Sequence, residues 1–112
     1  TSDYRLKENV VGITSAITRL KTLKPSRFNF VSDPSITLDG FIAHEVTAVP
    51  EAITGTKDEV YSEDEPSKNI KSGDPKYQGI DQSKLVPLLT AALQEAIIKI
   101  ESLEARVTEL EG

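Results

Sequence analysis

The sequence predicts an α+β fold in which a small head, built from a β-hairpin and short helices, precedes a long C-terminal helix. Three observations favour this fold. Apolar residues recur at helical spacing near the start of the chain and again, more regularly, through its last quarter. Between these stretches lie two short alternating segments joined by a turn sequence. We therefore divide the chain into a head, residues 1–84, and a coiled-coil helix, residues 85–112, which together form one folding unit.

The composition narrows the classes of function that the chain can serve. With 112 residues and a hydrophobic fraction of 38%, a single chain buries only a modest core, so association between copies would add stability. The net charge of −5 argues against a nucleic-acid partner, and no apolar stretch has the length of a membrane span. The absence of cysteine and of a second histidine removes thiolate chemistry and the two-histidine metal patterns. We expect no metal and no cofactor.

The first predicted helix covers residues 6–23. Gly12 weakens its middle, so the regular part is expected to begin after that residue. Pro25 ends it, because the residue before a proline is pushed out of the helical region. The apolar residues that define its face follow one another at intervals of three and four: Leu6, Val10, Ile13, Ile17 and Leu20.

The middle of the chain predicts a hairpin, two short helices and a loop. Residues 27–31 and 35–38 alternate as strands, with a turn at 32–34 between them, and two phenylalanines on one face are expected in the core. Residues 41–46 fit a strand or a helix equally well, and Pro50 suits the first position of a one-turn helix over residues 50–53. Residues 55–76 are polar and acidic, which is typical of a loop or a long exposed hairpin.

The last helix predicts a coiled coil. Asp81, or Ser83, caps its start, and Pro87 is tolerated only in the first turn, so the helix begins close to Leu85. Lys99 and Arg106 precede Glu104 and Glu111 by five residues, the pairing that parallel helices make between chains. Heptad spacing alone leaves the number of helices open. Its apolar seam consists of Val86, Leu89, Leu93, Ala96, Ile100, Leu103, Val107 and Leu110.

Four blocks of the sequence, in this order, resemble the endosialidase-type C-terminal intramolecular chaperone domain of phage tail spikes, tail fibres and neck appendages. The resemblance implies a short helix that ends near Ala48 and a coiled coil of three chains. It also implies that the chain cuts itself at the Thr1–Ser2 bond, with Ser2 as the nucleophile and Lys7 as the general base. The blocks are residues 2–10, 40–46, 49–52 and 77–81, the last of which runs into the long helix.

The implied chemistry needs these residue types. A serine hydroxyl is a weak nucleophile until a neighbouring group accepts its proton. A lysine amine accepts a proton near neutral pH only where burial or nearby positive charge lowers its pKa. Arg5, or a lysine of a neighbouring chain, is a candidate for that charge, and His44 or Glu45 could orient Lys7. A continuous helix from Ser2 would separate the two side chains, so we expect Ser2 to precede the first helix.

The leading hypothesis is therefore a self-cleaving chaperone that forms a homotrimer and helps an upstream fibre or spike segment of the same chain to fold. It would act in the host cytoplasm during virion assembly, and the released fibre would remain in the tail or neck appendage of the virion. The alternative is a permanent, uncleaved trimerisation or receptor-binding tip of a fibre. A glycan hydrolase would need two carboxylates in a cleft, and no such pair is evident in the sequence.

Overall fold

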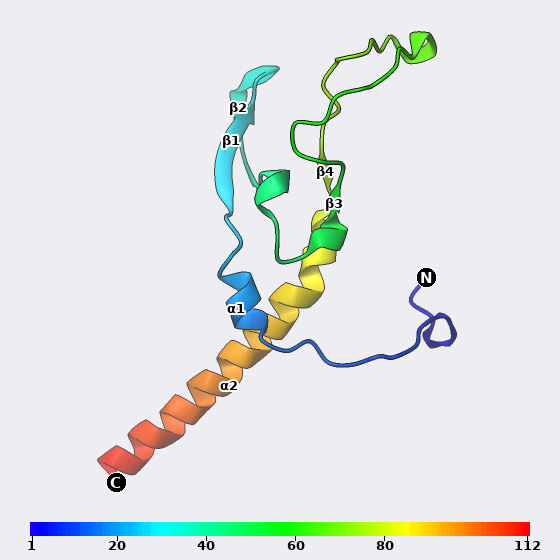
Figure 1. Ribbon diagram of the computed structural model, residues 1–112. Helices are drawn as coiled ribbons and strands as arrows, with labels where there is room; N and C mark the ends of the chain where they lie inside the picture. Colours follow the sequence, from blue (N-terminus) through cyan, green and yellow to red (C-terminus); the bar gives the residue numbers. More distant parts are fainter.

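The computed structural model describes residues 1–112 and shows an elongated molecule, 74 × 43 × 20 Å, built along one long helix (Figure 1). The helix α2, Val86–Glu111, has its C-terminal end free, while the other elements gather around its first turns. Two hairpin-like projections extend from the head in the direction away from the C-terminus (Figure 1). The α+β class and the long C-terminal helix are confirmed.

The start of α2 follows the sequence expectation closely. A short 3-10 helix, Gln82–Leu85, leads directly into α2, and Pro87 occupies the first turn. The Asp81 carboxylate oxygen Oδ1 accepts hydrogen bonds from the backbone N–H of Ser83 at 3.1 Å and from the Ser83 hydroxyl at 2.6 Å. Asp81 is therefore the N-cap of this 3-10 helix, because its side chain satisfies a backbone donor that the helix leaves unpaired.

The first helix is much shorter than the sequence predicted. Residues 4–6 form a 3-10 turn, Glu8 to Thr14 adopt no regular structure, and the α-helix α1 is only Ala16–Leu20. The prediction of a helix over residues 6–23 is therefore wrong for its first half. Val10 and Val11 are exposed and pack against nothing in the chain. Without a surface to cover its apolar face, a short helix is not stable in water.

The predicted hairpin is present, with its turn displaced. Strand β1, Ser26–Phe30, pairs antiparallel with β2, Asp33–Gly40, through partners such as Phe28 and Leu38. The turn is Val31-Ser32, rather than residues 32–34, and Pro34 lies inside β2. The register shifts between Phe28 and Phe30, and such a bulge tolerates a proline because the ladder lacks a hydrogen bond there.

The remaining elements of the head are short. Residues 41–46, which fitted a strand or a helix, contain only the 3-10 turn Ala43–Glu45, so the short helix that the resemblance implied ends before Ala48. A second 3-10 turn, Pro50–Ala52, begins at the predicted proline. Strand β3, Ile53–Thr54, pairs antiparallel with β4, Gly79–Ile80. Between them, residues 55–78 form a long exposed hairpin (the distal hairpin), held by bridges such as Glu65 to Ile70 and tipped by the 3-10 turn Pro66–Lys68. The expectation of an exposed hairpin is confirmed.

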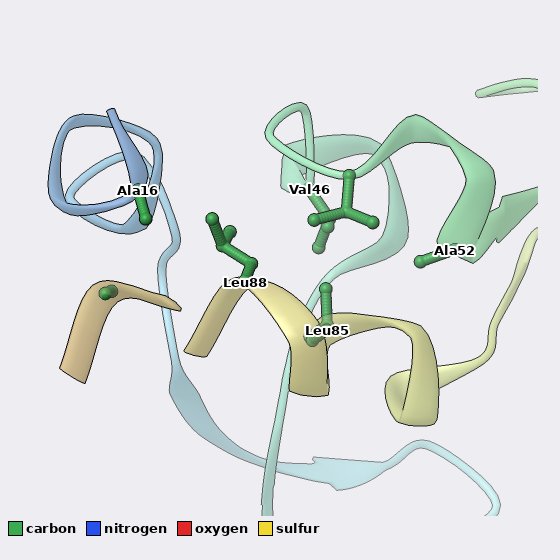
Figure 2. Packing of buried hydrophobic residues seen from close by; sticks show 7 residues of the cluster. Ala16, Val46, Ala52, Leu85 and Leu88 are labelled. Atoms are coloured by element: carbon green, nitrogen blue, oxygen red, sulfur yellow. The ribbon is translucent and has the colours of Figure 1, made fainter. Parts of the chain in front are cut away.

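The core lies where α1 and the segment before β3 meet the first turns of α2. Leu85 and Leu88 point from the start of α2 toward Ala16, Val46 and Ala52 (Figure 2). From Ile97 onward every residue of α2 is exposed. No helix is both long and apolar enough to cross a membrane. The buried hydrophobic residues are Ala16, Val46, Val49, Ala52, Leu85, Leu88 and Ala92.

Candidate functional site

The candidate site begins with a tight turn at the N-terminus. The Asp3 carboxylate accepts a hydrogen bond from the Arg5 backbone N–H at 2.9 Å and so caps the 3-10 turn Tyr4–Leu6. The Lys7 backbone N–H donates to the Tyr4 carbonyl at 3.1 Å and closes the turn. Ser2 therefore precedes the first helical turn, as expected, and Lys7 directly follows it.

This turn shortens the path between the two predicted catalytic residues. Three residues of 3-10 helix rise about 6 Å, whereas three extended residues span roughly 10 Å. Ser2 and Lys7 are both exposed, and no hydrogen bond joins the Ser2 hydroxyl to the Lys7 amine within one chain. Within one chain the structure therefore shows no contact between the two side chains.

Arg5 has a role that the sequence did not suggest. Its guanidinium pairs with Asp3 through two hydrogen bonds of 3.0 Å, from Nε to Oδ1 and from Nη2 to Oδ2. The hydrogen bond with Arg5 lowers the pKa of the Asp3 carboxyl, and it raises the pKa of Arg5. The positive charge of Arg5 is thus balanced locally, so that Arg5 is a weak source of like charge for Lys7 within one chain.

His44 and Glu45 lie in the head rather than beside the N-terminal turn. Both belong to the 3-10 turn Ala43–Glu45, and neither forms a hydrogen bond or ion pair with Lys7. In Figure 1 the N-terminus lies well apart from this part of the head. Orientation of Lys7 by either side chain would therefore need a neighbouring chain.

Residues 1–15 form an exposed arm. All fifteen are exposed, and Glu8 to Thr14 make no hydrogen bond to the rest of the chain. The arm nevertheless carries the large apolar side chains of Tyr4, Leu6, Val10 and Val11. A single chain thus presents the candidate site on an uncovered segment, where water surrounds every side chain that the chemistry would use.

The first fixed point after the arm is a contact that sequence reasoning missed. The Glu95 carboxylate accepts hydrogen bonds from the backbone N–H of Ala16 at 2.8 Å and of Ile17 at 3.2 Å. It therefore caps α1 from α2, whereas the side chain of Ser15, the residue that precedes α1, makes no capping bond. The partners are 79 and 78 residues apart in the chain, so no local pattern could have revealed the contact.

The predicted seam of α2 is uncovered in a single chain. Every one of its eight residues is exposed except Ala96, which is half-buried, and Ile97 beside the seam is exposed as well. Lys99, Arg106, Glu104 and Glu111 form no ion pair within the chain. The buried positions Leu85, Leu88 and Ala92 lie on a different face of α2. One face of the helix thus holds the head, and another is free for association.

Neither of two cavities in the head offers a pair of free carboxylates. One, of about 400 Å³, is lined mainly by apolar side chains such as Phe28, Phe41 and Ile80, and contains no titratable group. The other, of about 410 Å³, contains Asp58 and Glu59, which are paired with Lys57 and Lys76. These cavities lack the two opposed carboxylates that a glycoside hydrolase uses.

Comparison with known families gives one match. Residues 2–54 match the family model described as the chaperone of endosialidase, whose designation, Peptidase_S74, places it among the peptidases. The match begins at Ser2 and includes Lys7, His44 and Glu45. A comparison with curated proteins finds no match. The match confirms the family resemblance over the first half of the chain and implies a peptidase-type autoproteolytic domain.

Proposed function

We propose that this chain, whose residues 2–54 are a segment of the chaperone-of-endosialidase family, is a self-cleaving intramolecular chaperone of an upstream phage fibre or spike. The observation that carries the proposal is the family match itself, because it spans both Ser2 and Lys7. The uncovered seam of α2 and the unsupported arm favour an assembled form, since both present apolar side chains to water in a single chain.

Assembly is the first step of the proposed function. Three chains associate in parallel through the a and d positions of α2, from Val86 to Leu110, with the charged side chains beside the seam selecting the register. Association raises the local concentration of the three upstream segments, so a slow encounter of three chains becomes a local one. The upstream segments then fold together while the chaperone holds them.

Cleavage follows at the Thr1–Ser2 bond. The Ser2 hydroxyl oxygen attacks the carbonyl carbon of Thr1, and the Lys7 amine accepts the hydroxyl proton. Backbone N–H groups stabilise the resulting oxyanion. The C–N bond then breaks, the amino group of Ser2 receives the proton from Lys7, and Thr1 remains joined to the Ser2 oxygen as an ester. Water hydrolyses this ester, which frees the Thr1 carboxylate and restores the Ser2 hydroxyl.

Each chain therefore cuts once and only itself. The reaction takes place in the host cytoplasm during virion assembly, and the fibre without its chaperone enters the tail or neck appendage. The released fibre is kinetically trapped, because the domain that guided its association has left. Neither a nucleic acid nor a membrane takes part.

Expression of the chain behind its native upstream segment tests the proposal. Denaturing gels and intact masses should show cleavage between Thr1 and Ser2, and both Ser2→Ala and Lys7→Ala should abolish it while the assembly persists in sedimentation. The exposed residues Ser32 and Lys24 provide matched controls, and their alanine variants should cleave normally. An uncut parent that still assembles would exclude self-cleavage and establish the permanent trimerisation or receptor-binding tip instead.

A further inference from the structure

The structure points to Glu95 as the residue that positions the arm, and with it the Thr1–Ser2 bond, for cleavage. We define the latch as the Glu95 carboxylate together with the backbone N–H groups of Ala16 and Ile17 that donate to it. The latch itself is a geometric feature of the fold. Only its effect on cleavage rests on the proposed function.

The latch is the point at which the arm becomes fixed to the body. Nothing before Ala16 forms a hydrogen bond outside the arm except the Ser15 carbonyl, which accepts the first hydrogen bond of α1 from Arg19. Ala16 is fully buried, and it contacts α2 through both its side chain and its backbone N–H. The position and direction of the arm at its root are therefore set by α1 and by the group that holds the first turn of α1.

The residues next to α1 do not supply the group that holds its first turn. Ser15 has a positive φ of 54°, a left-handed conformation that a residue with a side chain rarely adopts, and its hydroxyl caps nothing. Such a conformation persists only where the surroundings hold it. Because α1 has only five residues, it has little stability of its own, and two hydrogen bonds to a carboxylate replace the missing cap.

The latch also connects the arm to the association surface. Glu95 lies one residue from Ala96 and two from Leu93, which belong to the a and d positions of the seam. The same turn of α2 thus carries the seam on one face and the latch on another. When the seams of three helices pack together, Glu95 fixes the direction, around the axis of α2, in which each arm leaves its helix. Glu95 is a positioning residue, since it touches neither Ser2 nor Lys7.

The experiment compares Glu95→Ala and Glu95→Gln with the parent chain carrying its native upstream segment. Alanine removes both acceptors, so cleavage should slow at least tenfold while the assembly persists. Glutamine keeps one oxygen acceptor and should retain an intermediate rate. Glu101→Ala removes an exposed carboxylate of the same helix that makes no hydrogen bond, and it should cleave at the parent rate.

A second measurement reports the position of the arm without any cleavage. The chain has no cysteine, so Thr14→Cys, at the root of the arm, and Ser102→Cys introduce a unique pair of sites for spin labels. Diluting labelled chains with unlabelled ones leaves one labelled chain in each assembly. The distance distribution between the labels should be narrow with Glu95 and should broaden with Glu95→Ala.

General loss of stability is separated from positioning by Val46→Ala, which opens the buried core on the side away from the arm. It should lower the melting temperature yet leave the label distances and the cleavage rate unchanged. If Val46→Ala slows cleavage as much as Glu95→Ala, or if Glu95→Ala leaves the distance distribution narrow, the positioning role is wrong. If the parent itself is never cut, the proposed self-cleavage is wrong. The label distances alone then test whether Glu95 positions the arm.

Discussion

Leu88 and Leu89 are neighbours in α2 and lie in opposite environments. The side chain of Leu88 is 1% exposed, packed between α1 and the segment before β3, whereas Leu89 is 43% exposed. Successive residues of an α-helix point about 100° apart, so one helix can serve two surfaces. The face with Leu88 holds the head of the same chain, and the face with Leu89 belongs to the predicted seam.

Alanine at these two positions should separate folding from association. Leu88→Ala opens a cavity in the core and should lower the free energy of unfolding by about 2–5 kcal/mol. Leu89→Ala should leave the head intact and weaken the assembly, because it removes an apolar contact from the seam. Thermal unfolding and sedimentation equilibrium measure the two effects. Unchanged association in Leu89→Ala would show that the seam has another use.

The orientation of the helices can be tested by exchanging charges beside the seam. Lys99→Glu places like charges opposite Glu104 of the neighbouring chain in a parallel bundle, and it should weaken association. Combining Lys99→Glu with Glu104→Lys should restore it, with a recovery that fades at high salt because the pairs are exposed. Sedimentation at low and high salt gives the answer. In an antiparallel bundle the second change would bring no recovery.

Acid should weaken the start of α2 through Asp81. The hydrogen bond from the Ser83 hydroxyl lowers the pKa of the Asp81 carboxyl below its ordinary value of 3.8. Its contribution to stability is therefore full above pH 3.8 and is lost as the pH falls through the lowered folded-state pKa. Asp81→Asn keeps a capping oxygen but carries no charge. The difference in melting temperature between the parent and Asp81→Asn should be largest near pH 7 and vanish in strong acid.

Gly79 is required by its close approach to Thr54 across the β3–β4 pair. A Cβ at this position would lie 2.9 Å from the Thr54 Oγ1 atom, which is too close for either group to remain in place. Gly79→Ala should therefore destabilise the protein by about 1–3 kcal/mol, and adding Thr54→Ala should recover most of that loss. Urea unfolding of both variants measures the coupling. Gly12→Ala meets no atom within 4 Å and is the matched control.

Local patterns predicted the parts of the fold whose causes are local. Asp81 caps the 3-10 helix that leads into α2, and Pro87 is tolerated in the first turn of α2; both act over a few residues. Pro50 likewise begins the predicted turn in the head. Ser2 and Lys7 were singled out through the family resemblance of residues 2–10, and their catalytic roles stay a prediction.

The errors arose where packing decides between alternatives. Val10 has the spacing of a helical face, but no element of the chain covers that face, and the predicted helix does not form there. The turn before Pro34 moved because a bulge in the strand pair accommodates the proline. Glu95 was missed because its partners, Ala16 and Ile17, come close to it only in the folded chain.

The distribution of core residues along the chain has a consequence for biosynthesis. Ala16, Val46, Val49 and Ala52 are made before the residues against which they pack, which are Leu85 just before α2 and Leu88 and Ala92 within it. Because translation runs from the N-terminus, the hairpin and the turns of the head have nothing to fold against until the first turns of α2 emerge from the ribosome. Any polypeptide upstream has already been synthesised by that moment. The order of residues thus delays core closure until the segment up to Ala92 has been synthesised.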